Sequence, residues 1–108
     1  MDFFERYFNQ ISKKLLLEDK KKFNQLVDEL KKTKKAKKKV ILYGNGGSAA
    51  MASHLSLDLT KACKIRAVNF NEADLLTCFS NDYGYENWVK EAINSYADKN
   101  DLVICISS

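Results

Sequence analysis

The chain has 108 residues, of which 45% are hydrophobic and 30% are charged, and its formal net charge at pH 7 is +4. These values are typical of one small globular domain. No apolar run approaches the roughly 20 residues of a membrane-spanning helix, and the first residues lack the apolar core of a signal peptide. We therefore expect a cytoplasmic protein with no membrane partner.

The positive charge is concentrated in the first third of the chain. Residues 1–39 hold 13 basic and 6 acidic side chains, whereas the remaining residues hold 5 basic and 8 acidic ones. The surplus comes mainly from one group of lysines: Lys31, Lys32, Lys34, Lys35, Lys37, Lys38 and Lys39. Such a group can bind nucleic acid or another anionic surface. However, no aromatic or glycine residues interleave it, so we interpret it as a solvated helix end and expect no nucleic-acid partner.

Two amphipathic helices are predicted at the N-terminus, over residues 2–17 and 19–36. In both segments apolar residues recur at spacings of three and four, which is typical of one helix face. These residues are Phe4, Phe8, Ile11 and Leu15, followed by Phe23, Leu26, Val27 and Leu30. We expect residues 1–38 to form a helical hairpin. The first stripe exceeds what a hairpin covers, so it should also pack on the rest of the domain or on another subunit.

Residues 39–108 follow the alternating pattern of an α/β fold with a parallel sheet. Short continuous apolar runs predict buried strands at 40–43 and 102–106. A further strand is expected at 67–70. The segments between them predict helices over 48–62, 72–80 and 86–97, with a turn at 81–85.

Two expectations concern the chain end and the thiols. The sequence stops at Ser107–Ser108, directly after a strand that needs a crossover and a neighbour, so we expect a longer natural protein. Residues 39–108 would then be an incomplete N-terminal half of a domain. Cys63, Cys78 and Cys105 show no CxxC spacing, and we expect reduced, buried thiols.

The segment Gly44–Ser48 carries the strongest functional signal. It lies between a predicted strand and a predicted helix, and Gly44, Gly46 and Gly47 let the backbone approach a ligand closely. The following helix offers unpaired N–H groups and the positive end of its dipole. Ser48 could cap that helix or bind phosphate itself. Three glycines in four positions exceed the needs of a tight turn, so we favour phosphate binding over a turn without a ligand.

A dinucleotide site is the alternative for this loop. Gly44, Gly46 and Ala49 satisfy a loose G-x-G-x-x-A fingerprint, and Glu72 could bind a ribose hydroxyl. However, Glu72 follows Gly44 by 28 residues rather than the usual distance of about 20. Two helices before the first strand also fit this alternative poorly, and we expect no nucleotide cofactor.

The sequence resembles the sugar isomerase (SIS) domain family, and specifically its phosphoheptose isomerase branch. The resemblance rests on Gly44-Asn-Gly-Gly-Ser-Ala-Ala50 followed by His54, on Asn81–Tyr85, and on Val103–Ser108, which is similar to the strand before a serine-rich phosphate loop. It covers essentially the whole chain. It implies a three-layer α/β/α domain of the flavodoxin-like type, truncated here before its last strands and helices. It also implies a homotetramer.

The resemblance implies a role for several residues. Asn45, Ser48, Ser107 and Ser108 match residues that bind the sugar phosphate, and Asp82 matches an aspartate that contacts the substrate. His54 matches a histidine that binds zinc in some members. Asp58 stands where the isomerases carry a glutamate that serves as catalytic base and can also bind the metal.

The residues themselves support a functional pair at His54 and Asp58. At positions i and i+4 they share one helix face, where they could hold Zn²⁺, act as an acid–base pair, or simply contact each other at the surface. The aspartate is one methylene shorter than the family glutamate, and a displacement of about 1 Å can lower a rate by about a hundredfold.

The leading hypothesis is a sugar-phosphate isomerase, acting on a substrate such as sedoheptulose 7-phosphate in heptose and lipopolysaccharide precursor synthesis. Both substrate and pathway are implied by the resemblance alone. The 108 residues by themselves are expected to be inactive, because most of the second phosphate loop is missing. A non-catalytic sugar-phosphate sensor or adaptor is the second hypothesis, and a dinucleotide-binding domain is the third.

Overall fold

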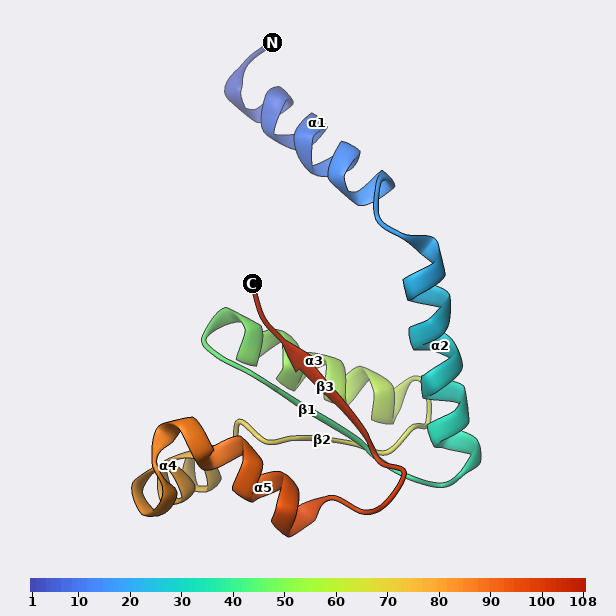
Figure 1. Cartoon of the computed structure of the whole chain (residues 1–108). Helices are drawn as coiled ribbons and strands as arrows, with labels where there is room; N and C mark the ends of the chain where they lie inside the picture. The colour runs from blue at the N-terminus through green and yellow to red at the C-terminus, as the bar shows by residue number, and fades with distance from the viewer.

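A computed structural model describes all 108 residues as a small sheet domain with a long helical extension (Figure 1). The elements are α1 (Phe3–Leu16), α2 (Lys20–Lys35), β1 (Val40–Gly44), α3 (Gly47–Lys61), β2 (Ala67–Asn69), α4 (Ala73–Tyr83), the short 3-10 helix η1 (Tyr85–Asn87), α5 (Trp88–Tyr96) and β3 (Leu102–Ile106). None of the helices is long and apolar enough to span a membrane.

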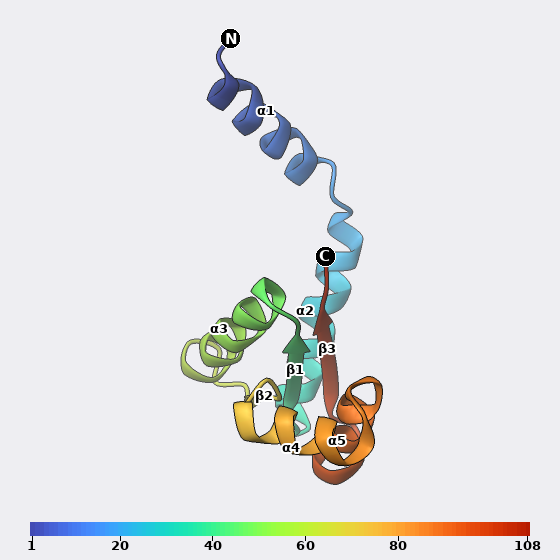
Figure 2. The same ribbon diagram turned by 90° about the vertical axis from the view of Figure 1, so that its left-hand side faces the viewer.

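The three strands form a parallel sheet in the order β2-β1-β3. Val40 at the start of β1 lies opposite Ala67 of β2 and Leu102 of β3, so the amino ends of all three strands meet at one edge. Helix α3 covers one face of the sheet, and α4 and α5 cover the other (Figures 1 and 2). The predicted three-layer α/β/α architecture is therefore confirmed.

The central strand holds the two sides of the core together. Val40 and Leu42 pack toward α3, while Ile41 packs against Phe70 and Trp88 on the other face. These first three residues of β1 are all fully buried. Burying one such side chain contributes about 1.5–3 kcal/mol. The predicted burial of this strand on both faces is confirmed.

Strand β3 and the cysteines are more exposed than predicted. Alternate residues of β3 face solvent, and Val103 is 40% exposed, because no further strand or helix lies beyond this edge. Cys63, Cys78 and Cys105 are free thiols, but all three are exposed, so the prediction of burial was wrong. They lie in the turn after α3, on α4 and on the half-covered strand β3.

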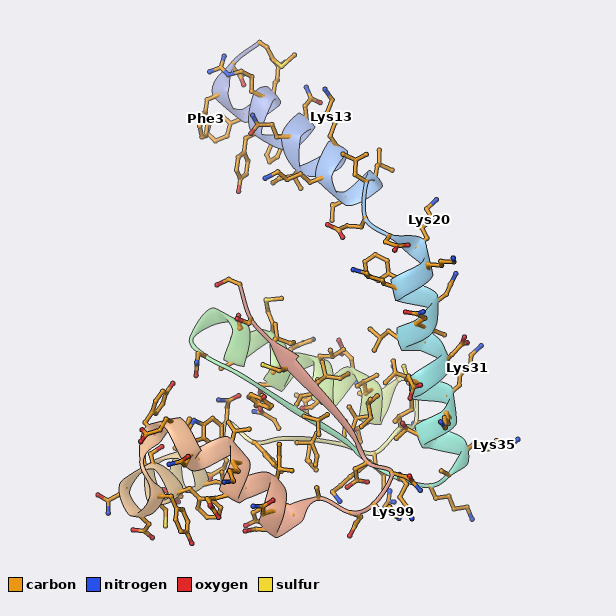
Figure 3. All side chains as sticks on the ribbon, viewed as in Figure 1. Phe3, Lys13, Lys20, Lys31, Lys35 and Lys99 are labelled. Atoms are coloured by element: carbon orange, nitrogen blue, oxygen red, sulfur yellow. The ribbon has the colours of Figure 1, made fainter.

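The N-terminal helices form where predicted, but they do not form a hairpin. Each begins at an aspartate N-cap, and Asp2 and Glu5 exchange both hydrogen bonds of a capping box. Figures 1 and 2 show α1 continuing away from α2 instead of folding back along it. No residue of the link at 17–19 has a positive φ that would reverse the chain. The side chains of α1, including Phe3, consequently stand free of the sheet domain (Figure 3).

The turn predicted at 81–85 begins later in the structure than in the prediction. Helix α4 continues through Tyr83 and ends at Gly84, whose φ of 91° suits glycine. Asn81 and Asp82 therefore lie on the last turn of α4, and Tyr85 opens η1.

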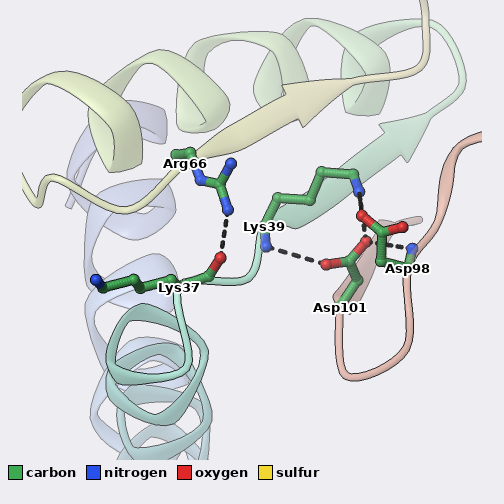
Figure 4. Close-up of polar contacts among 5 residues, drawn as sticks. All are labelled: Lys37, Lys39, Arg66, Asp98 and Asp101. Atoms are coloured by element: carbon green, nitrogen blue, oxygen red, sulfur yellow. Dashed lines mark hydrogen bonds and ion pairs between the residues drawn. The ribbon is translucent and has the colours of Figure 1, made fainter.

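A charged cluster joins the starts of β1 and β3 (Figure 4). The Lys39 ammonium donates to Asp101 at 2.6 Å and to Asp98 at 3.0 Å. The Asp101 carboxylate, which is only 2% exposed, also accepts from the backbone N–H groups of Lys39 at 3.1 Å and Asp98 at 2.7 Å. These contacts fix the two strands in register at their amino ends.

Replacing Asp101 with Asn should destabilise the domain. The variant loses the ion pair and points an amide N–H₂ at the donors that the carboxylate now satisfies. We expect the free energy of unfolding to fall by about 1–3 kcal/mol, the lower end reflecting water near the cluster. Urea unfolding measures the loss, and Asp98→Asn, at a carboxylate that is 70% exposed, is the matched control and should have a smaller effect. Equal stability of Asp101→Asn and wild type would contradict this role.

The same cluster gives stability a defined pH dependence. Burial works to raise the pKa of Asp101, but the hydrogen bonds from Lys39 and Asp98 outweigh it and hold the pKa below the ordinary 3.8. Its contribution is therefore full above about pH 4 and is lost as the pH falls through the lower folded value. The hydrogen bond to Asp101 raises the pKa of Lys39 above 10.5, so that contribution is full below 10.5 and is lost as the pH rises through the folded value.

Candidate functional site

The loop between β1 and α3 presents unpaired backbone donors. The strand ends at Gly44, the helix begins at Gly47, and Gly46 takes a φ of 55° and a ψ of −123°. The N–H groups of Asn45, Gly46 and Gly47 have no acceptor within the chain. Three consecutive free donors at the positive end of a helix form an anion-binding arrangement. Gly46, rather than Ser48, is the N-cap of α3, which leaves the Ser48 hydroxyl free of that role.

Gly44 is fixed at a point where the backbone of three elements converges. A Cβ there would lie 2.7 Å from the carbonyl carbon of Ser48 and 2.8 Å from the carbonyl oxygen of Ile106. The Asn71 side chain clamps the same residue, accepting from the Gly44 N–H at 2.8 Å and donating to the Gly44 carbonyl at 2.7 Å. Nothing in the sequence marks Asn71 for this role, because the contact joins residues 27 positions apart.

A cavity of about 400 Å³ opens where β1 and β3 end. Its lining includes Gly44, Asn45 and Ser48 from the first loop, and Ser107 and Ser108 from the segment after β3. The chain leaves β1 over one face of the sheet and reaches β3 from the other face, so this crevice is a topological switch point. Ligands of open α/β sheets bind at such crevices. The structure therefore brings together the two segments expected to bind phosphate.

Residues from η1 and α5 close the side of this cavity. The Tyr85 hydroxyl donates to the side-chain oxygen of Asn45 at 2.9 Å, and Glu86 and Trp88 also line the space. The neighbouring Cys105 thiol raises the pKa of the Tyr43 phenol above 10, and partial burial adds to the shift. Tyr85 belongs to the Asn81–Tyr85 motif, but nothing in the sequence indicates its hydrogen bond to Asn45, 40 residues earlier.

His54 and Asp58 form the expected i, i+4 contact on α3. The His54 Nε2 atom lies 3.4 Å from Asp58 Oδ1, and the two side chains are 75% and 61% exposed. Neither lines the cavity. No third histidine, cysteine or carboxylate joins them to form a group that could hold a metal ion. His54 and Asp58 are two ligands of types that zinc accepts, whereas a protein zinc site needs at least three protein ligands. The residues of this chain alone therefore do not form a zinc site.

Asp82 and Glu72 lie away from the cavity. Asp82 is exposed on α4, where its carboxylate contacts Asn81 Nδ2 at 3.3 Å and Cys78 Sγ at 3.8 Å. Glu72 caps α4 by accepting from the Leu75 N–H at 2.9 Å, and this hydrogen bond lowers the pKa of the carboxyl below its ordinary value. Glu72 is thus engaged as a helix cap, which weakens the dinucleotide alternative.

A family model described as "SIS domain" matches residues 3–108, which include α1, α2 and the whole sheet domain. The chain belongs to the SIS domain family. The predicted resemblance is confirmed, and the glycine loop, the switch-point cavity and the terminal serines are parts of a SIS domain.

Curated relatives and a solved structure agree with this assignment. The SIS domain is 37% identical over 76 residues to phosphoheptose isomerase of Helicobacter pylori strain HPAG1, covering 65% of this chain and 40% of that protein. It is 33% identical to phosphoheptose isomerase of Nitratiruptor sp., covering 88% of this chain and 60% of the relative. The structure of phosphoheptose isomerase GmhA from Neisseria gonorrhoeae matches with a TM-score of 0.67 at 23% identity, over 99% of this chain and 61% of that one. The chain thus spans about 40–60% of the length of these relatives.

Proposed function

We propose that the complete protein is a phosphosugar isomerase that acts on a heptose phosphate such as sedoheptulose 7-phosphate. One observation carries the proposal: Gly44, Asn45 and Ser48 of the first loop line a single switch-point cavity together with Ser107 and Ser108, next to the free N–H groups of residues 45–47. This arrangement suits a phosphate dianion. The phosphoheptose isomerases among its relatives supply the substrate class.

In the proposed mechanism the chain binds the phosphate and a base moves a proton. The loop N–H groups and serines hold the phosphate remote from the reacting carbons, and this binding orients the sugar. Starting from the ketose, a base removes a C1 proton while the C2 carbonyl oxygen gains a proton, which gives an enediol. A proton is then returned to C2 while the C1 hydroxyl loses its proton, which gives the aldose. Asp58 is the base in this scheme, and His54, in contact with it, orients the carboxylate. No step passes through a metal.

We propose that this site is completed in a homo-oligomer, with a tetramer implied by the resemblance. Asp58 lies 11 residues into α3, roughly 16 Å along its axis at about 1.5 Å per residue. That distance exceeds the carbon chain between C2 and C7 of a heptose, so the base and the phosphate loop of one chain are too far apart for one substrate. The uncovered stripe of α1, with Phe4 63% and Phe8 60% exposed, offers an apolar surface for such assembly.

A non-catalytic sugar-phosphate sensor or adaptor is the second candidate. Two observations favour it: aspartate stands at the position of the family glutamate, and the His54–Asp58 pair is exposed outside the cavity. Such a protein would bind the sugar phosphate without moving its protons. It would need the glycine loop but not Asp58.

Proton exchange in deuterated water separates the two candidates. The complete protein, incubated with sedoheptulose 7-phosphate, should introduce deuterium next to the carbonyl carbon, which NMR detects as loss of the C–H signal. Binding without exchange would instead establish the adaptor.

A parallel zinc titration tests the expected cofactor: zinc that binds wild type but not His54→Ala would support it, and equal uptake by both would contradict it.

A further inference from the structure

A second hollow, which is strongly basic, lies at the opposite edge of the sheet from the glycine loop. It has a volume of about 350 Å³ and is lined by Lys34, Lys37, Lys38, Lys64, Ile65 and Arg66. Residues 37–38 lie one residue before β1 and residues 64–66 directly precede β2, so the hollow sits at the amino ends of these strands. The sugar-phosphate cavity sits at the carboxyl ends. Nothing in the proposed isomerase uses this hollow.

The charge of the hollow is uncompensated. Five of its six lining residues are cationic, no carboxylate lines it, and none of the five takes part in an ion pair. Clustered cations without counter-charges repel one another, and this repulsion is relieved when an anion binds. Lys39, the next lysine along the chain, differs in this respect, since Asp98 and Asp101 neutralise it.

Two of the cations are held in place by backbone carbonyls. The Lys34 ammonium donates to the Cys63 carbonyl at 2.9 Å, and the Arg66 guanidinium donates to the Lys37 carbonyl (Figure 4). These bonds link the end of α2 to the segment after α3. A guanidinium has five N–H donors and an ammonium three, so both side chains keep donors free for a ligand. The hollow is therefore organised before any anion arrives.

Lysine also occupies two backbone positions that favour glycine. Lys37 and Lys64 both have a φ of 57°, and each lies just after the end of a helix. After α2 the Lys38 N–H bonds to the Thr33 carbonyl, as in a Schellman motif, whereas after α3 the Ile65 N–H bonds to the Leu59 carbonyl, six residues back. Glycine is the usual residue there because a side chain is strained at positive φ. Attraction to the helix C-termini explains cations nearby, but it does not require them at the two strained positions.

We propose that this hollow, formed by Lys34, Lys37, Lys38, Lys64 and Arg66, binds a compact polyphosphate, either inorganic or the phosphate tail of a nucleotide. A hollow of this size suits a small ligand rather than a nucleic-acid duplex. Its lining has no aromatic side chain to stack on a base, so it recognises the phosphates themselves. Several adjacent phosphates match the five cations better than a single phosphate does. The site is independent of the proposed isomerase activity.

Calorimetry of the complete protein with sodium tripolyphosphate, ATP and orthophosphate, all without Mg²⁺, tests this site. Tripolyphosphate and ATP should bind with similar affinity, orthophosphate should bind at least about tenfold more weakly, and added salt should weaken all three. Absence of tripolyphosphate binding would overturn the proposal. So would binding of ATP alone, or binding of single-stranded RNA or anionic vesicles that tripolyphosphate does not displace.

A pair of double variants locates the binding. Lys37→Gly/Lys64→Gly should weaken tripolyphosphate about tenfold or more, while the thermal midpoint stays the same or rises, because glycine relieves the strain at both positions. Lys20→Gln/Lys21→Gln removes the same charge at the other end of α2 (Figure 3) and should change affinity less than about threefold. If the glycine variant fails to fold, Lys37→Asn/Lys64→Asn replaces it, because asparagine tolerates this conformation. The site would be contradicted if the glycine and glutamine double variants weakened tripolyphosphate binding equally. It would also be contradicted if the glycine double variant did not weaken that binding.

Discussion

Gly44→Ala is expected to destabilise the protein by roughly 2–4 kcal/mol and to abolish sugar-phosphate binding. The new Cβ would lie within 2.7–2.8 Å of backbone atoms of Ser48 and Ile106. Backbone atoms of a helix and a strand cannot rotate away as a flexible side chain can. The end of β1 must therefore move relative to α3 or β3, and such a movement displaces both phosphate-binding segments together.

Gly47→Ala is the matched control for this prediction. A Cβ at Gly47 meets nothing within 4 Å, and its φ is not positive. Because the residue begins α3, alanine fits the helix there, and we expect the free energy of unfolding to change by less than about 0.5 kcal/mol. Urea unfolding and calorimetry with the sugar phosphate measure both variants. A Gly44→Ala protein as stable as Gly47→Ala would contradict the close approach of these three elements.

Asp58→Asn is expected to lower exchange of the C1 proton of sedoheptulose 7-phosphate by at least about a hundredfold while leaving sugar-phosphate affinity nearly unchanged. Asparagine keeps the shape of the side chain but cannot accept the proton. Asp58 is 61% exposed, so the substitution should change the free energy of unfolding by less than about 0.5 kcal/mol. NMR in deuterated water measures the exchange, and calorimetry measures the affinity.

Two further variants show whether a loss of exchange comes from Asp58 itself. Asp58→Glu restores the family residue and should keep or raise the rate. Asp28→Asn removes a different exposed carboxylate, on α2, and should leave the rate unchanged. If Asp58→Asn exchanges as fast as wild type, Asp58 is only a surface partner of His54 and the base lies elsewhere in the complete protein.

The sheet could be predicted because its signals are local. The continuous apolar run at 40–43 is fully buried over its first three residues, and the predicted helix at 48–62 differs by one residue at each end from the observed α3. Glycine spacing likewise identified the loop whose three N–H groups stay free. In each case neighbouring residues in the sequence determine the local conformation.

Features that depend on distant contacts could not be predicted. An amphipathic stripe shows which face of α1 is apolar but not which element covers that face. The predicted helical hairpin was therefore wrong. The prediction that the cysteines are buried was wrong for the same reason, since exposure of Cys105 depends on the elements beside β3. The clamp from Asn71 to Gly44 and the bond from Tyr85 to Asn45 join residues 27 and 40 positions apart, with no periodicity to reveal them.

The central claim is that the glycine loop of this SIS domain binds a phosphorylated sugar and not a dinucleotide. Calorimetry of the complete protein with sedoheptulose 7-phosphate, arabinose 5-phosphate and NAD tests it most directly. At least one of the sugar phosphates should bind, NAD should give no heat beyond dilution, and Gly44→Ala should remove the sugar-phosphate signal while Gly47→Ala retains it. Tight binding of NAD with no response to either sugar phosphate would contradict the claim.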